Sequence, residues 1–329
     1  MASRTEEEIM DNWCGERIAP LVSVCCTTYN HEEFIAQAIE GFLMQETDFP
    51  FEVIIRDDCS TDSTASIVME YVERFPNIIK PIFEAENQYS KGVKPMPVVF
   101  KKAVGEYFAL CEGDDFWTDT HKLEKQLIVF KRWENTMICF HSAEELDEET
   151  ENKKVICKYF SHGMEIGIKD VIAGRGGYMP TASIMLKNVH IDEMIAALKG
   201  APIGDYFMQV YMGSLGEVRF LSDTMCVYRR NANGSWTHRQ KEKSNRKAYR
   251  LKMVVAIDKF SQYFESIELK NNLYLALRFY ALSYIREARG YRKIIAIYEV
   301  INSLNNYSTF RWIQYEFYMA CKLGGGFEL

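Results

Sequence analysis

Short apolar runs that alternate with helix-patterned segments limit most strongly what this chain can fold into. The runs occupy residues 21–27, 51–55, 78–83 and 107–111. Between and after them, apolar residues recur at helical spacing, over 34–43, 67–72 and 123–129. Strands buried on both faces have such continuous apolar sequences, and strand–helix alternation is typical of a parallel sheet. The sequence therefore predicts an α/β fold with a mostly parallel, doubly wound central sheet flanked by helices.

Polar clusters follow three of these runs, at the point where each strand should end. They are Thr-Thr-Tyr-Asn at 27–30, Asp57-Asp58, and Glu-Gly-Asp-Asp at 112–115. Ligands bind beyond the carboxyl ends of the strands in parallel sheets, at a topological switch point. We therefore expect the three clusters to form one site.

The run Glu112-Gly113-Asp114-Asp115 carries the most specific chemistry. Gly113 permits a tight turn, so that the carboxylates on either side can point the same way. Carboxylate oxygens in that arrangement suit Mg²⁺ or Mn²⁺ held jointly with the phosphates of a substrate. An isolated run of this kind is more often an acidic surface loop. Here an apolar strand precedes it and Phe116-Trp117 follow, which favours a metal site.

The second cluster continues from Asp57 and Asp58 to Ser60 and Asp62. A carboxylate at a strand end can accept a hydrogen bond from the N–H of a base such as uracil, or from a ribose hydroxyl. Ser60 and Asp62 are also good caps for the helix that follows. We expect the later residues to cap that helix and Asp57 or Asp58 to contact a ligand.

Asp205 stands directly before a helix-patterned segment, in the run Ile-Gly-Asp-Tyr-Phe at 203–207. An acid in that place is most often a helix cap. A general base instead needs a semi-buried carboxylate, whose pKa lies closer to the working pH. Tyr206 and Phe207 could provide that burial, so both interpretations remain open at this point.

Two consecutive arginines, Arg229 and Arg230, follow a short strand-like run. The guanidinium fork matches the shape of a diphosphate. The alternative is that both arginines only balance the acidic surface. His238 lies closest to this cluster among the histidines, and a lone histidine is usually structural or solvated.

Composition excludes several classes of protein. The 329 residues include 39 Lys and Arg against 46 Asp and Glu, a net charge of −7, which makes a general nucleic-acid binder a poor interpretation. The nine cysteines include no Cys-x-x-Cys, and five of them lie in apolar runs, as expected of reduced core residues in a cytosolic protein. Residues 1–13 are acidic and polar, so we expect no signal peptide there. No apolar run approaches the length of a membrane span.

Charge and glycine content divide the rest of the chain. Residues 1–19 form an N-terminal extension, and the charged stretch 144–154 predicts a solvated loop or hairpin tip. Glycine and proline nearly vanish after residue 240, where helical periodicity predominates. We therefore predict a C-terminal, all-helical appendage over 239–329.

The motifs together resemble the family 2 glycosyltransferases of the GT-A fold. The resemblance rests on VSVCCTTYNHEEFIAQAIEGFLMQ, FEVIIRDDCSTDSTASI and GEYFALCEGDDFWTD, and then on GDYF and VYRRNANGSW. It covers residues 20–238, and it implies a nucleotide-sugar half over 20–135 and an acceptor half over 136–238. No signature for dinucleotide, P-loop or serine-hydrolase sites occurs.

The resemblance implies an inverting transfer from a nucleotide-diphosphate sugar, with uridine nucleotides as the expected donors and Mn²⁺ or Mg²⁺ as cofactor. The residues it implies for the nucleotide sugar are Thr27, Tyr29, Asp57, Asp58, Glu112, Gly113, Arg229 and Arg230. Asp114, Glu112 and Asp115 would serve the metal, Asp114 by direct coordination. Asp205 matches the position of the family's general base.

Two positions depart from the family pattern. Glu112 replaces the first aspartate of the D-x-D motif, and Asn231 stands where related sequences often have a histidine. Whether Asn231 or His238 contributes to the metal or phosphate site is therefore open.

We expect a cytosolic bacterial enzyme of surface polysaccharide or glycolipid assembly, with a saccharide or lipid-linked acceptor. A lipid-linked acceptor would bring peripheral contact with the inner face of the cell membrane. Two alternatives remain: a non-catalytic sugar-nucleotide-binding or assembly protein of the same fold, and a metal-dependent nucleotidyltransferase.

Overall fold

The computed structural model describes residues 4–14, 19–232 and 243–288, together with 295–296, 299–300 and 304. The first part of the chain forms α1 (Glu6–Met10), β1 (Val22–Thr28), α2 (Ile35–Leu43), β2 (Phe51–Asp57), α3 (Thr64–Arg74), β3 (Ile79–Phe83), η1 (Tyr89–Lys91), α4 (Pro95–Phe100), β4 (Tyr107–Glu112), β5 (Phe116–Trp117) and α5 (Lys122–Arg132). The second part forms β6 (Thr136–Asp147), β7 (Lys153–Ile156), β8 (Met164–Ile166), α6 (Ile168–Gly174), η2 (Thr181–Ser183), β9 (Met185–Lys187), α7 (Ile191–Ala197), α8 (Asp205–Leu215), β10 (Glu217–Arg230), α10 (Lys243–Ser261) and α11 (Ile267–Arg286). The four apolar runs that open the chain are β1, β2, β3 and β4, as predicted.

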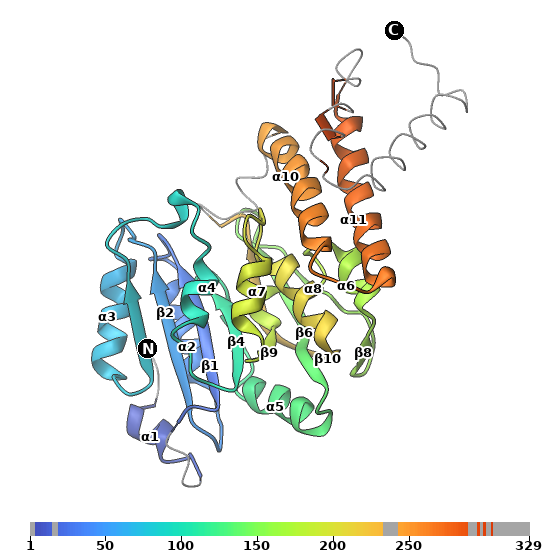
Figure 1. Ribbon diagram of the computed structural model, residues 1–329. Helices are drawn as coiled ribbons and strands as arrows, with labels where there is room; N and C mark the ends of the chain where they lie inside the picture. The colour runs from blue at the N-terminus through green and yellow to red at the C-terminus, as the bar shows by residue number, and fades with distance from the viewer. Residues whose placement is uncertain are drawn as a thin grey trace.

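In the described residues, one ten-stranded sheet forms the centre of the molecule (Figure 1). Its main path runs β3-β2-β1-β4-β9-β6-β10-β5, with β7 on β6 and β8 on β10. The pairs β2–β3, β1–β2, β1–β4 and β6–β10 are parallel, whereas β9 is antiparallel to both of its neighbours. The mostly parallel α/β sheet predicted from the sequence is confirmed.

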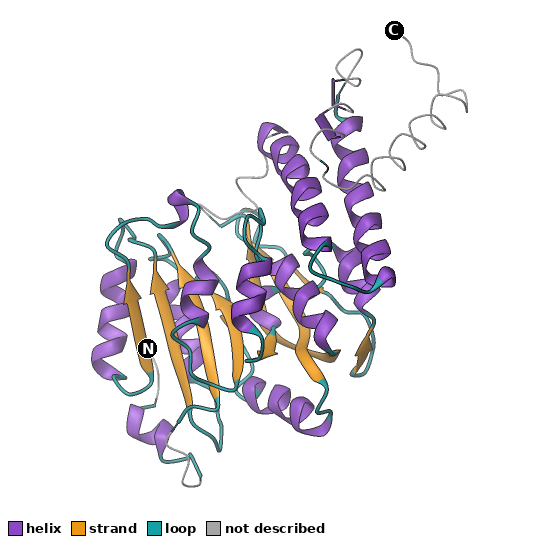
Figure 2. Ribbon diagram, in the orientation of Figure 1, coloured by secondary structure: helices purple, strands orange, loops and turns teal. Residues whose placement is uncertain are grey.

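The central strands are buried on both faces, because successive side chains point to opposite sides. Cys25, Phe108 and Leu110 belong to the core that includes residues of α4, α6, α7 and α8. Cys26, Ala109 and Cys111 belong to the core that includes residues of α2, α3 and α5. Figure 2 shows helices beside the sheet along its whole width. This double covering explains why the strand sequences are apolar without alternation.

The charged stretch 144–154 is the tip of the β6–β7 hairpin, as predicted. The apolar sequence of residues 182–186 predicts a further strand, but only its end, from Met185, belongs to one, β9. The 3₁₀ turn η2 covers its start, because the Ser183 hydroxyl donates to the carbonyl oxygen of Pro180 at 2.7 Å. The indole N–H of Trp117 donates to the carbonyl oxygen of Ala182 at 2.9 Å, so the turn is fixed from inside the core.

The C-terminal region is helical over its described part, as predicted. α10 and α11 lie side by side and project from one end of the sheet (Figure 1). They are not detached from the rest of the fold, because the rings of Phe207 in α8 and Phe260 in α10 meet edge to face, 5.0 Å apart. No described helix has the length and apolarity needed to cross a membrane.

The described cysteines carry free thiols. Cys25, Cys26, Cys111, Cys139 and Cys226 are buried, as predicted for core residues. Burial raises the pKa of these thiols, which keeps them protonated.

Candidate active site

The ends of three adjacent parallel strands form the floor of the site. In the ladders, Thr28 of β1 lies opposite Asp57 of β2, and Thr27 lies opposite Glu112 of β4. The amide of Gly113 donates to the carbonyl oxygen of Thr27 at 2.9 Å, and that of Asp58 donates to Thr28 at 3.1 Å. The three polar clusters are therefore brought together, as the parallel topology predicts.

The acidic turn after β4 gathers three carboxylates. Glu112, Asp114 and Asp115 each offer an oxygen, and these oxygens lie within 4.8 Å of one another. One oxygen of Asp115, Oδ2, is buried and has no hydrogen-bond partner. A buried carboxylate oxygen without a donor is costly unless a cation or proton satisfies it. The turn therefore fits a divalent cation.

The pKa values of these acids reflect the same crowding. Burial, helped by the charges of Asp114 and Asp205, raises the pKa of Glu112 to about 8. Burial and the neighbouring carboxylates Asp114 and Glu112 also raise the pKa of Asp115. Negative charge at this turn is unfavourable without a counter-charge, and a bound cation would supply one.

Gly113 is required by close contact with β1. A Cβ at this position would lie 2.7 Å from Oγ1 and 2.8 Å from Cβ of Thr28. The absence of a side chain lets the acidic turn lie against the end of β1, which positions Glu112 and Asp114.

Arg229 of β10 contacts the acidic turn directly and bonds to other protein groups as well. Its amide donates to Asp115 Oδ1 at 2.8 Å, and its Nη1 donates to the carbonyl oxygen of Asp114 at 2.6 Å. Nε pairs with Glu148 at 2.7 Å, and Nη2 donates to Gln37. The side chain is 6% exposed. These contacts hold the turn, and they engage each nitrogen of the guanidinium group. Diphosphate binding by Arg229 stays a prediction.

The side chains of the two residues that follow Arg229 contact strand β6. Arg230 is exposed, and its Nη1 lies 3.5 Å from Glu145 Oε1. The side-chain amide of Asn231 donates to Asp147, the last residue of β6, at 3.0 Å. His238 lies outside the described residues.

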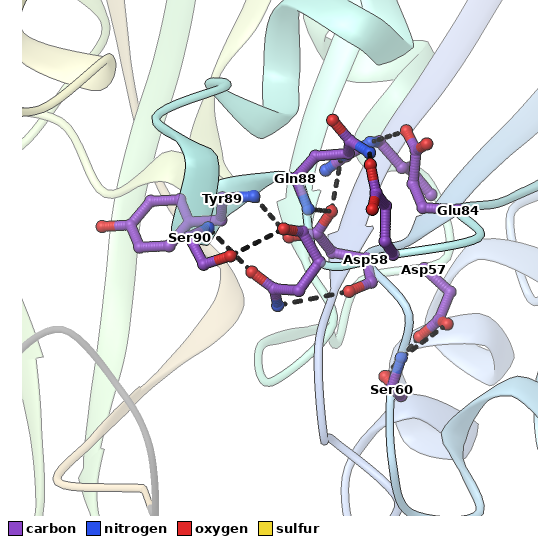
Figure 3. A network of polar contacts seen from close by, with 10 residues as sticks. Asp57, Asp58, Ser60, Glu84, Gln88, Tyr89 and Ser90 are labelled. Carbon is purple, nitrogen blue, oxygen red and sulfur yellow. Dashed lines mark hydrogen bonds and ion pairs between the residues drawn. The ribbon is translucent and has the colours of Figure 1, made fainter.

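Asp57 fixes the loop that follows β2. Its Oδ2 accepts the amide of Ser60 at 3.0 Å, and its Oδ1 accepts the Ser60 hydroxyl (Figure 3). The Ser60 hydroxyl oxygen in turn accepts the amide of Asn30 at 2.9 Å. Asp62 Oδ1 accepts the amide of Thr64, the first residue of α3, at 3.0 Å, but the N-cap residue is Ser63, whose side chain makes no capping hydrogen bond. The prediction that Ser60 caps this helix is wrong, because its hydroxyl bonds to Asp57 and Asn30. This network joins the loops after β1 and β2.

Asp58 fixes a different segment, the one that follows β3. Its Oδ1 accepts the amide of Gln88 at 3.0 Å and its Oδ2 that of Tyr89 at 2.9 Å (Figure 3). The buried guanidinium of Arg56 bridges Asp58, at 2.6 Å, and Glu84, at 2.8 Å. Asp57 and Asp58 thus organise the loops on the side of the site where a nucleotide is predicted, and their contact with a base stays a prediction.

The remaining predicted nucleotide residues differ in exposure. Thr27 is buried, whereas Tyr29 is 41% exposed directly after β1. An aromatic ring at that edge is available to a flat ligand.

Asp205 is the first residue of α8, and Gly204 occupies the N-cap position. Burial raises the pKa of Asp205, against the backbone amides of Tyr206 and Asp205 and the charge of Lys94. Tyr206 and Phe207 are buried, as predicted. The charge of Asp205 also contributes, after burial and Asp114, to the raised pKa of Glu112, so the two carboxylates are within electrostatic reach of each other.

Sequence reasoning missed two residues at the site. His31 Nε2 lies 3.9 Å from Asp114 Oδ2, and its Nδ1 is buried without a hydrogen-bond partner. Its place next to Asn30 in the first polar cluster was a usable signal. Lys94, which acts on Asp205 by its charge, stands in no motif.

Comparison with known proteins places the chain in a family. The model of the family described as "Glycosyl transferase family 2" matches residues 23–193. The chain belongs to glycosyltransferase family 2. The matched part of the chain begins within β1, contains β2 and the acidic turn, and ends before Asp205.

One curated relative is "Uncharacterized protein Mb1547" of Mycobacterium bovis, 37% identical over 216 residues, which are 65% of this chain and 60% of the relative. The chain thus spans less than two-thirds of that relative's length.

Two solved structures share the fold. The structure of Staphylococcus aureus TarS 1–349 in complex with UDP-GlcNAc is 16% identical, with a TM-score of 0.52 over 91% of this chain and 92% of that one. The mannosyltransferase PcManGT from Pyrobaculum calidifontis, in complex with GDP-Man and Mn²⁺, is also 16% identical, with a TM-score of 0.52 over 92% and 81%. The curated TarS sequence is named poly(ribitol-phosphate) beta-N-acetylglucosaminyltransferase, and it is 36% identical over 97 residues, 29% of this chain and 16% of TarS. At these identities the structures show the GT-A fold of this family 2 chain.

Proposed function

We propose that this protein is an inverting glycosyltransferase that moves a sugar from a nucleotide-diphosphate sugar to an acceptor hydroxyl. The observation that carries the proposal is the turn of three carboxylates with a buried, unpartnered Asp115 Oδ2, joined by the electrostatic coupling of Glu112 and Asp205. Glu112 and Asp205 come from opposite halves of the predicted transferase region, yet the charge of Asp205 acts on the pKa of Glu112. A cation-binding turn and a second, semi-buried carboxylate therefore serve one site, as a two-substrate transfer requires.

The metal is the first part of the proposal. Glu112, Asp114 and Asp115 would hold Mn²⁺ or Mg²⁺, with Asp114 as the direct ligand and Glu112 close enough to bind through water. When bound, the ion would neutralise charge on the departing diphosphate. The Mn²⁺ in PcManGT and the unpartnered Asp115 Oδ2 support this assignment.

The donor is the second part. Thr27, Tyr29, Asp57 and Asp58 would line the nucleotide pocket, and a uridine nucleotide is the proposed donor. The UDP-GlcNAc held by TarS supports uridine, whereas the GDP-Man of PcManGT shows that the fold accepts another base. A titration with UDP, GDP and CDP compares the three bases directly.

Asp205 is the third part, as the general base. Its carboxylate would take the proton from the acceptor hydroxyl as the oxygen attacks the anomeric carbon, opposite the leaving diphosphate. Burial raises its pKa, which makes it a better proton acceptor than an ordinary aspartate at neutral pH. Attack and departure in line invert the anomeric centre.

The acceptor is proposed to be a saccharide or lipid-linked glycan of surface polysaccharide assembly, which would bring the protein into peripheral contact with the membrane. The name of TarS, which specifies a poly(ribitol-phosphate) acceptor, supports an envelope polymer. We also propose that residues 20–238 form the transferase unit and that 239–329 form a helical region beside its acceptor half.

The test is a titration followed by product analysis. UDP, GDP and CDP are titrated with and without Mn²⁺ into the wild type and Asp114→Asn. We expect Mn²⁺-dependent binding of UDP that the variant loses. The UDP-sugars are then incubated with glycan acceptors, and the products are analysed by mass spectrometry. A transferred sugar supports the proposal. A transferred nucleotide indicates a nucleotidyltransferase, and binding without transfer across the donor and acceptor panel indicates a non-catalytic binding protein.

A further inference from the structure

The segment between β3 and α4 contains contacts that the motifs do not explain. At its start, Glu84 pairs with Arg56, and the amides of Gln88 and Tyr89 donate to the carboxylate of Asp58. Figure 3 shows the amides of Gln88 and Tyr89 directed at the carboxylate of Asp58. This end of the segment is therefore fixed to the nucleotide side of the site.

The other end of the same segment reaches the acceptor side. Lys94, at the N-cap position of α4, extends its ammonium to the carbonyl oxygen of Pro202, where Nζ donates at 2.8 Å. Pro202 lies three residues before Asp205, in the turn between α7 and α8. Gly200 in that turn has φ +83°, a left-handed conformation that other residues rarely adopt. A hydrogen bond from a residue 108 positions away in the sequence therefore stabilises this turn.

Charge couples the two residues as well. Burial lowers the pKa of Lys94, and the charge of Asp205 opposes that change. Lys94 in turn favours the ionised form of Asp205. The charge of Asp205 also acts on Glu112, Tyr249 and Tyr280. Other cations lie in the same region, since Lys252 acts on Lys94, and Arg175 and Arg250 act on Tyr280, but the cation that acts directly on Asp205 is Lys94. The half-buried Lys94 therefore partly compensates the negative charge of Asp205, the proposed base.

We propose that Lys94 is a positioning residue for Asp205: it holds the 200–204 turn so that the carboxylate faces the acceptor hydroxyl. The inference rests on the proposed function of Asp205. Lys94 binds the turn that carries the base and takes no part in proton transfer. Because its segment also holds Asp58, about ten residues of chain link the nucleotide side to the base.

The experiment compares Lys94→Met and Lys94→Gln with the wild type. The control is Lys91→Met, a change of an exposed lysine on the same segment whose ammonium pairs with Glu86. We expect Lys94→Met to lower kcat about 100-fold, as misplacement of a reacting group by an ångström does, while nucleotide affinity changes less than about threefold. Lys94→Gln, which keeps a donor for Pro202, should recover part of kcat. Lys91→Met should retain the kcat of the wild type.

A double-mutant cycle with Asp205→Asn distinguishes positioning from general damage. If Lys94 acts through Asp205, Lys94→Met should cost less than about threefold in the Asp205→Asn background, because the two effects are not additive. An equal loss in both backgrounds would overturn the inference, as would a wild-type kcat for Lys94→Met. Should Lys94→Met fail to fold, Lys94→Gln enters the cycle with the same expected non-additivity. A wild type that transfers no sugar would count against the proposed function instead.

Discussion

The amide of Arg229 donates to the carboxylate of Asp115 at 2.8 Å, while its guanidinium donates to the carbonyl oxygen of Asp114 at 2.6 Å. One residue of β10 thus holds two consecutive residues of the acidic turn. The fork also reaches Glu148 on the β6–β7 hairpin and Gln37 on α2. Arg229 therefore links the acidic turn to three elements that are remote in sequence, β10, the β6–β7 hairpin and α2.

Arg229→Lys tests this support. Lysine keeps the positive charge but loses the planar fork, so that it cannot serve Asp114, Glu148 and Gln37 together. We expect a loss of about 2–4 kcal/mol in the free energy of unfolding, because a buried ion pair is left incomplete. Mn²⁺ affinity should fall by about tenfold, an energy of roughly 1.4 kcal/mol. Urea unfolding and Mn²⁺ titration measure the two effects.

The matched control is Arg230→Lys, at the exposed neighbouring arginine. It should leave both the unfolding free energy and Mn²⁺ affinity close to those of the wild type. If Arg229→Lys also bound Mn²⁺ normally, the acidic turn would not depend on Arg229 for its geometry.

Gly113→Ala should displace the acidic turn from β1. The new Cβ would come within 3.0 Å of both the Oγ1 and the Cβ of Thr28, so that one of the strand ends must move. We expect a destabilisation of about 2 kcal/mol, as is typical of overpacking in a tight core, together with weaker Mn²⁺ binding. Gly177→Ala is the control, because its nearest contact is an ordinary 3.6 Å. Equal stability of the two variants would contradict the close approach.

The raised pKa of Glu112 predicts a pH-dependent stability. In the absence of metal, the folded protein keeps the Glu112 proton up to about pH 8, whereas the unfolded chain releases it near its ordinary pKa of 4.5. Over that window the folded state binds more protons, so this group makes stability fall as the pH rises. A divalent cation needs the ionised carboxylate, so its stabilisation should grow over the same window.

Thermal unfolding at pH 6 and pH 8, with EDTA or Mn²⁺, checks this expectation. Mn²⁺ should raise Tm more at pH 8 than at pH 6. Glu112→Gln should remove this group's contribution to the pH dependence and raise Tm at pH 8 without metal, by about 2 °C. A metal-induced shift in Tm that is equal at both pH values would argue against Glu112 as a ligand.

The fold and the acidic part of the site could be predicted from the sequence because their signals are local. β1, β2 and β4 are continuous apolar runs, and parallel topology then requires that Thr27, Asp57 and Glu112 meet at one edge. His31 had a usable local signal as well, since it directly follows Asn30.

The supports of the site could not be predicted in the same way. Strand alternation puts one of Arg229 and Arg230 inside, but the register shifts within β10 decide which of them it is. The contact of Lys94 with Pro202 spans 108 residues and follows from the arrangement of two loops. No periodic pattern in a single sequence encodes such a contact.

The most direct test of the account is the chemical step in Asp205→Asn. Sugar transfer is measured in single turnovers with the donor selected by the nucleotide titration, and nucleotide affinity is measured on the same preparation. Asparagine keeps the shape of the side chain but takes no proton, so we expect transfer to fall by about 10²–10⁴-fold with nucleotide affinity retained. Transfer at the wild-type rate would contradict Asp205 as the general base, and with it the mechanism proposed for this site.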